Sequence, residues 1–224
     1  MGIELSELEL GEETYEGRLN RPEGAAESDV GVVMIPGAGH GPFGNIFDIV
    51  AYELAGTGKH VFRYESWETP DEMRAKTFGD LHAEVDAAIA RLRAEGCDEV
   101  HLIAKSFGGG IALTHVPDAV DRLLLWAPAI DLVEGERVNH DADERIGDTE
   151  DVPIAVGTGN LEAIDVPVRI LVGDEDGGML PEDCERIATA VGDGDVTVLP
   201  GENHSFNENR TAIVTETLRY LGNS

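Results

Sequence analysis

The chain has few basic residues for its length. It contains 16 lysines and arginines against 45 aspartates and glutamates, which gives a formal net charge of −29 over 224 residues. A surface of this charge repels the phosphates of nucleic acids and the anionic headgroups of membranes. We therefore exclude nucleic acid and membrane surfaces as partners.

Disorder does not explain this charge. The acidic residues are spread along the chain, and 42% of all residues are hydrophobic, which is typical of a folded protein. Like charges repel one another in a folded chain, and dissolved salt screens that repulsion over a few ångströms. The composition therefore predicts adaptation to a salt-rich cytoplasm, such as that of an extreme halophile.

Cysteine, targeting signals and long apolar runs are also scarce. Cys97 and Cys184 are the two cysteines, and their separation matches no metal or redox motif, which suits a reducing compartment. The opening MGIELSELEL has neither the basic nor the apolar part of a secretory signal, and no run is long enough to span a bilayer. We expect a cytoplasmic protein with residues 1–224 in a single domain.

The most informative stretch present is EVHLIAKSFGGG, residues 99–110. The apolar run 100–104 predicts a buried strand, and the residues after the glycines continue as an apolar helix. Ser106 then lies on an abrupt turn between strand and helix. Ala104 and Gly108 are small enough for the two backbones to approach, and Ser106 is expected to adopt strained dihedral angles. This is the arrangement of the G-x-S-x-G motif, with Ala104 in place of the first glycine.

The remaining pattern alternates strands with helices. Apolar runs predict strands at 3–10, 13–19, 30–35, 60–66, 122–127, 166–173 and 195–199, and helices at 45–56, 71–95, 181–191 and 207–221. The first two strands are expected to form an antiparallel hairpin. Such alternation predicts an α/β fold, a mostly parallel central sheet with helices on both faces. Ligands bind beyond the carboxyl ends of strands in such sheets.

Residues 130–165 interrupt this alternation. They follow the strand at 122–127 and are polar, acidic and rich in glycine, with no strong period. We expect a short acidic insert there that forms a small lid or hairpin.

The loop after the strand at 30–35 runs from Pro36 to Gly44 and contains four glycines. Backbone amides in such a loop can approach a reacting group closely and stabilise an oxyanion. We assign this role to the amides of Ala38 and Phe107, with Gly39 as the alternative to Ala38. No Gly-Lys-Ser/Thr follows the loop and the dinucleotide fingerprint is incomplete, so a nucleotide site is disfavoured.

Two further loops carry an acid and a base. Asp176 and Asp174 follow the strand at 166–173; Asp176 is preferred because it lies further out, beside a flexible glycine pair, and Asp131 is a third candidate. His204 follows the last strand, where an imidazole can reach the serine hydroxyl as general base. His40 is the other loop histidine at this edge, and it belongs to the glycine loop.

Serine, acid and histidine in this order, after a glycine loop, make the chain resemble the α/β-hydrolase superfamily from about residue 29 to 221. It looks most like the small serine hydrolases of that fold, which are carboxylesterase-like. The resemblance implies a nucleophile, an acid, a base and two oxyanion amides at Ser106, Asp176, His204, Ala38 and Phe107. Two positions depart from the family pattern: Ala104 replaces a glycine, and Pro36 stands where many members have histidine.

The predicted reaction is cleavage of a carboxylic ester or thioester of a small molecule, through an acyl-enzyme and without a metal or organic cofactor. The residues expected to contact the substrate are Gly39, Phe43, Trp67 and Met179. Lys105 is interpreted as a surface neighbour of the nucleophile, and Trp126 as core.

Three alternatives remain open. The same fold and triad serve acyltransferases, peptidases and C–C hydrolases. A ligand-binding protein can keep the fold without turnover. An acidic metal module around His140, Asp141, Asp143 and Glu144 is disfavoured, because the spacing does not suit a closed site. The oligomeric state is left open.

Overall fold

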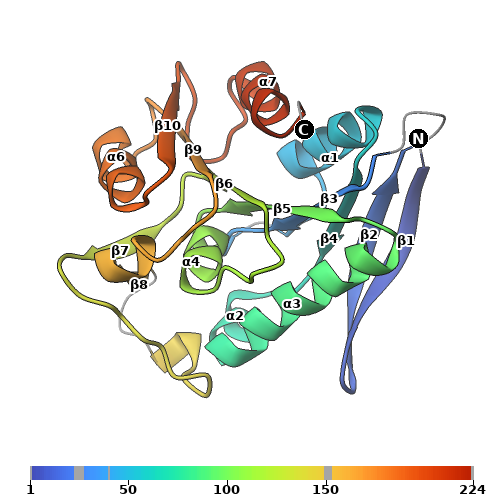
Figure 1. The fold of residues 1–224 in the computed structure, drawn as a ribbon, viewed down its shortest axis with the longest axis horizontal. Coiled ribbons are helices and arrows are strands. Elements are labelled where there is room, and N and C mark those ends of the chain that lie inside the picture. The colour runs from blue at the N-terminus through green and yellow to red at the C-terminus, as the bar shows by residue number, and fades with distance from the viewer. Residues whose placement is uncertain (1, 23–27, 40, 149–152, 223–224) are drawn as a thin grey trace.

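The computed structural model describes residues 2–22, 28–39, 41–148 and 153–222. Its main element is an eight-stranded sheet (Figure 1). In spatial order the strands are β1 (Gly2–Leu10), β2 (Glu13–Arg21), β4 (His60–Tyr64), β3 (Val30–Ile35), β5 (Glu99–Lys105), β6 (Arg122–Trp126), β9 (Val168–Gly173) and β10 (Gly194–Leu199). β1 pairs with β2, and β2 with β4, antiparallel, and all other neighbours are parallel. The predicted α/β class, hairpin and mostly parallel sheet are confirmed.

Helices cover both faces of the sheet. α1 (Asn45–Gly56) and α7 (Arg210–Leu221) pack together on one face, while α3 (Phe78–Ala94), α4 (Phe107–Thr114) and α6 (Pro181–Ala190) lie on the other (Figure 1). The two-sided cover explains why the central strands are apolar on both faces rather than alternating.

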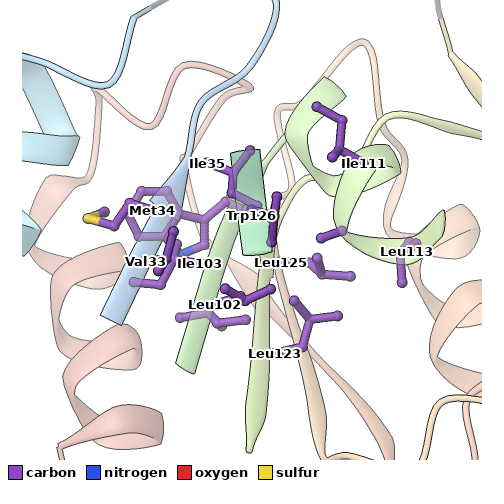
Figure 2. Close-up of a cluster of buried hydrophobic side chains, with 14 of the residues drawn as sticks. Val33, Met34, Ile35, Leu102, Ile103, Ile111, Leu113, Leu123, Leu125 and Trp126 are labelled. Atoms are coloured by element: carbon purple, nitrogen blue, oxygen red, sulfur yellow. The ribbon is translucent and has the colours of Figure 1, made fainter. Parts of the chain in front are cut away.

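The core lies at β3, β5 and β6. Side chains from these strands and from α4 form one buried cluster, which Figure 2 shows: Val33, Met34, Ile35, Leu102, Ile103, Ile111, Leu113, Leu123, Leu125 and Trp126. Each such side chain contributes about 1.5–3 kcal/mol when it is fully buried. The cluster therefore makes a rigid base for the loops that leave these strands.

The register brings the carboxyl ends of these strands to one edge. Ile35 pairs with Ala104, and Lys105 pairs with Trp126, which in turn lies opposite Leu171 on β9. The ends of β9 and β10 align in the same way. The loops that follow all these strands consequently meet at that edge.

The helix predicted at 71–95 is two helices, α2 (Pro70–Ala75) and α3. Lys76 is extended, with φ −72° and ψ 150°, and ends α2. Thr77 then caps α3: its hydroxyl accepts the Asp80 amide, and the Asp80 carboxylate accepts the Thr77 amide. This capping box starts a new helix where the apolar period alone continues the old one.

The insert is not a hairpin. β7 (Ile130–Val133) and β8 (Ile154–Gly157) pair in parallel. The chain that leaves the end of β7 must therefore run back to the level at which β7 begins before β8 can start. On its way it runs along the start of α3, where the Phe78 and Gly79 amides donate to the carbonyls of Glu144 and Ala142. That segment includes a short 3₁₀ helix, η1 (Ile146–Asp148), and α5 (Thr158–Leu161) follows β8. Residues 149–152 lie outside the description, and the lid role stays a prediction.

Both cysteines are free and buried. Within the described ranges, no helix has the length and apolar character to cross a membrane.

Candidate active site

Ser106 occupies the tight turn between β5 and α4. Its backbone has φ 51° and ψ −119°, which is the strained conformation expected for a non-glycine residue at this turn. Its amide donates to the Trp126 carbonyl at 2.9 Å, and its carbonyl accepts the Gly109 and Ala129 amides at 2.9 and 3.0 Å. Three backbone hydrogen bonds thus hold the serine in place on the sheet edge.

Gly108 lets the loop after β3 approach this turn. A Cβ atom at position 108 would collide with the carbonyl oxygen of Pro36, so a very small residue is needed there because of the neighbouring β3 loop rather than because of the approach of β5 and α4. In the same loop, a Cβ on Gly37 would lie 3.1 Å from the Ser106 Cβ. The glycine loop therefore lies directly against the serine.

The structure brings Ser106, His204 and Asp176 together. His204 Nε2 lies 2.9 Å from Ser106 Oγ, and His204 Nδ1 lies 2.8 Å from Asp176 Oδ2. The Asp176 side chain is fully buried, whereas the His204 side chain is 35% exposed. The three groups come from loops after three different strands, as the sequence predicts.

Asp176 is prepared to stay ionised. Burial opposes its charge, but the hydrogen bonds from His204 and from the amides of Gly178 and Met179 outweigh burial and lower its pKa below the ordinary value. Those two amides donate to Oδ1 at 2.8 and 2.9 Å. Oδ1 is thereby held by the backbone, and Oδ2 is free to receive the imidazole.

The two other candidate acids have different surroundings. Asp174 Oδ1 accepts the Gly201 amide at 2.6 Å, so this carboxylate braces the loop after β10. Asp131 is exposed on β7. In the described part of the chain, neither forms a hydrogen bond to His204.

Glu202 organises the loop that carries His204, and sequence reasoning missed it. Its buried carboxylate accepts the amides of Asn203, Glu208 and Asn209 at 2.9, 3.1 and 2.7 Å. These bonds tie both ends of the loop to one side chain. Its position two residues before the histidine was the available signal, but one glutamate among 45 acids does not stand out.

The predicted oxyanion donors are available for a ligand. Phe107 is the first residue of α4, so its amide has no partner inside the helix. Across the described residues, neither the Ala38 nor the Phe107 amide donates a hydrogen bond to another protein group. Gly39 is exposed next to Ala38, and His40 lies outside the description.

The expected substrate-contact residues lie in different places. Trp67 packs edge-on against Phe107 with ring centroids 5.6 Å apart, and Met179 lies beside Asp176. Phe43 instead lies under the Arg18 guanidinium, 4.1 Å from its ring centroid, on the β2 side. Trp126 is fully buried core, as expected.

Lys105 is not a surface residue, which corrects the sequence interpretation. It is 5% exposed, because it is the last residue of the central strand β5 and lies beneath the start of α1 and the loop that precedes α7. Burial lowers the pKa of its ammonium, and the charge of Asp176 opposes that shift. It lines a small cavity beside the turn that carries Ser106.

The acidic stretch of the insert forms turns. The Asp143 amide donates to the Asp141 carboxylate, the Glu144 amide donates to the Asp141 carbonyl, and His140 Nε2 lies 2.8 Å from the Ala155 carbonyl. Over the described ranges, no group of three or more histidine, cysteine, aspartate or glutamate side chains is arranged to hold a metal ion.

No protein-family model matches the sequence, and no curated protein matches it either. Solved structures do match. Est1E from Butyrivibrio proteoclasticus is 13% identical with a TM-score of 0.74, and the match covers 97% of each chain. A dienelactone hydrolase from Anabaena variabilis is 18% identical with a TM-score of 0.71, over 98% of this chain and 96% of that one.

A third similar structure is an α/β serine hydrolase without a lid from Xanthomonas campestris. It is 15% identical with a TM-score of 0.70, over 97% of this chain and 94% of that one. Strand order, helix placement and these matches over nearly the whole length agree. The chain therefore has the α/β-hydrolase fold.

Proposed function

We propose that the protein is a serine hydrolase that cleaves carboxylic esters or thioesters of small molecules. The observation that carries the proposal is the hydrogen-bonded series from Ser106 through His204 to the buried Asp176. The serine sits on a strained turn, and the Ala38 and Phe107 amides beside it donate to no other protein group among the described residues. Similar structures include a protein named as a serine hydrolase, an esterase domain from Rhodothermus marinus and dienelactone hydrolases.

In the first half of the reaction, Ser106 Oγ attacks the substrate carbonyl carbon while His204 Nε2 takes the hydroxyl proton. The Ala38 and Phe107 amides donate to the developing oxyanion; removing one such donor typically costs about 3–4 kcal/mol of transition-state stabilisation. Asp176 accepts the Nδ1 proton, fixes the tautomer of the ring and stabilises the imidazolium.

In the second half, His204 returns its proton to the leaving alcohol or thiol, and an acyl-enzyme remains on Ser106. Water then attacks the acyl carbon, with His204 again as base, and releases the acid. These steps use protein groups and water, and need no metal or organic cofactor. The same fold and triad also serve other reactions: acyltransferases differ in the acceptor that takes the acyl group, whereas peptidases and C–C hydrolases differ in the bond that is cleaved.

We also propose where the enzyme works. The excess of 45 acidic over 16 basic residues supports a salt-rich cytoplasm, and two free buried cysteines suit a reducing compartment.

The test is covalent labelling with a fluorophosphonate in molar KCl, with the adduct mapped by mass spectrometry. We expect one adduct on Ser106, lost in Ser106→Ala and strongly slowed in His204→Ala. Ser6→Ala, on β1, is the matched control and should label as the parent does. Hydrolysis of short and long acyl esters then defines the substrate range. Folded protein that does not label contradicts the proposal and indicates a ligand-binding protein on this fold.

A further inference from the structure

A small cavity lies beside the turn that carries Ser106, between the start of α1 and the loop that joins β10 to α7. Its volume is about 80 Å³, several times the roughly 10–15 Å³ that one water molecule requires. It is lined by Gly41, Gly44, Asn45, Ile46, Phe47, Lys105, Ser205, Phe206, Asn207 and Arg210. Lys105 and Ser205 are the chain neighbours of the proposed nucleophile and base.

Lys105 is an unpaired cation in the wall of this cavity. It is 95% buried, and among the described residues it forms no hydrogen bond and no ion pair. The charge of Asp176 acts on it, but Asp176 already binds His204, and the Lys105 Nζ lies 5.9 Å from the centre of the Phe206 ring. An ammonium has three donors, and burial without acceptors is costly, so this group is suited to an acceptor that enters the cavity.

The start of α1 adds further donors to the same cavity. This helix has 12 residues, Gly44 precedes it, and no side chain caps its first amides. Asp48, the acid in its first turn, accepts hydrogen bonds from the buried Arg63 and from the Gly44 amide. Among the described residues, the amides of Asn45, Ile46 and Phe47 donate to no other group, and they lie at the positive end of the helix dipole.

The cavity is also free of acidic side chains. None of its lining residues is an aspartate or glutamate, although the chain contains 45 of them. Arg210 at its rim forms no ion pair within the described chain, whereas Arg169, for example, pairs with Asp195. Lys105 and Arg210 therefore bring two cations without a carboxylate partner to one cavity.

We propose that this cavity binds an anionic group of the substrate, a carboxylate or a phosphate, through Lys105, Arg210 and the first amides of α1. The inference rests on the proposed hydrolase function and narrows its substrates to esters or thioesters with an anionic group near the scissile bond. The cavity is lined by Lys105, which directly precedes Ser106, and by Ser205, which directly follows His204. An anion bound there would hold an adjoining carbonyl group near the proposed nucleophile and base.

The test compares kcat/KM between anionic esters and neutral esters of similar shape. On the acyl side, para-nitrophenyl hydrogen glutarate is compared with para-nitrophenyl valerate. On the leaving-group side, meta-acetoxybenzoate and meta-acetoxyphenyl phosphate are compared with methyl meta-acetoxybenzoate. The parent protein should prefer the anionic member of at least one pair by about tenfold or more. The two leaving-group anions distinguish carboxylate from phosphate.

Lys105→Met should abolish this preference, and Arg210→Gln, at an exposed position that leaves folding intact, should reduce it several-fold. Lys59→Met is the matched control: Lys59 is also buried, but it precedes β4 at the opposite edge of the sheet. Its preference ratio should equal that of the parent. Preference for the neutral ester in every pair, or an undiminished ratio in both cavity variants, overturns the proposal.

A binding measurement separates this proposal from the proposed function. Calorimetric titration of Ser106→Ala with glutarate and with inorganic phosphate measures the affinity of the cavity for an anion in the absence of turnover. Binding that is lost in Ser106→Ala/Lys105→Met supports the anion site even where no ester is cleaved. Ester cleavage without anion preference and without anion binding overturns the anion site and leaves the hydrolase.

Discussion

Two carboxylates in one loop have different partners, although they are separated by a single residue. Asp176 is buried, takes two backbone amides on one oxygen and presents the other oxygen to His204. Asp174 points to the next loop and accepts the Gly201 amide. Since both are aspartates in the same turn, local backbone direction decides which one meets the imidazole.

This difference predicts the effect of neutralising each acid. Asp176→Asn should lower kcat by about 10⁴-fold, because an amide favours the wrong imidazole tautomer and does not stabilise the imidazolium. Asp174→Asn, the matched control, should lower kcat by less than about tenfold, because its oxygen still accepts the Gly201 amide. Initial rates on a chromogenic ester at saturating concentration measure both. Equal losses in the two variants contradict the assignment of Asp176.

The sequence predicted which side chains meet at the candidate site, and their catalytic roles stay a proposal. Small neighbours at a strand end indicate Ser106, and loop position and chain order indicate His204. Lys105 and Glu202 could not be placed in this way, because their surroundings depend on burial. Nothing in the residues next to a lysine at the end of a strand indicates that the start of α1 and the loop before α7 will bury it.

At the scale of elements, strands were predicted better than connections. Apolar runs indicate buried strands directly, and parallel register then brings their ends together. The break at Lys76 was missed because the apolar period continues through it, while the capping pair Thr77 and Asp80 starts a new helix. The pairing of β7 with β8 was missed because it joins short segments far apart in sequence.

The contact between α3 and the end of α4 predicts sensitivity to acid. The side chain of His82, on α3, contacts the end of α4: its Nε2 lies 3.0 Å from Thr114 Oγ1. Its ring stacks on that of His115, with the ring centroids 4.6 Å apart. Burial first, and then repulsion from His115 and His140, lower the pKa of His82 to about 4, while Asp86 opposes the shift. The folded protein therefore keeps this ring neutral where the unfolded chain protonates it.

Between pH 6.5 and about 4 the unfolded state binds the extra proton, so stability falls as pH falls through this window. Allowing for solvent screening, we expect His82 to account for about 2 kcal/mol of the loss. His82→Gln should remove that part, as measured by urea unfolding at several pH values. His115→Gln should retain most of it, since burial is the larger cause. Parallel pH profiles for parent and His82→Gln contradict this prediction.

At the scale of the whole molecule, repulsion among the acidic side chains destabilises the folded state that the buried core stabilises. The 45 acids outnumber the 16 bases, so most carboxylates have no basic partner. Exposed ion pairs such as that of Arg186 with Glu134 contribute little each. Repulsion summed over the surface is therefore the main electrostatic contribution to folding, and it works against the folded state.

Salt should stabilise this protein by screening, and most of the effect should appear below about 1 M, where the Debye length falls to roughly 3 Å. We expect the melting temperature to rise steeply with KCl and then more slowly. The triple variant Glu7→Gln, Glu9→Gln and Glu12→Gln, all exposed on the first hairpin, should melt higher in dilute buffer and gain less from KCl. Sucrose is the control, because it is excluded from the surface without screening charge. If sucrose and KCl act alike on parent and variant, exclusion rather than screening explains the stabilisation, and the acidic surface has no electrostatic need of salt.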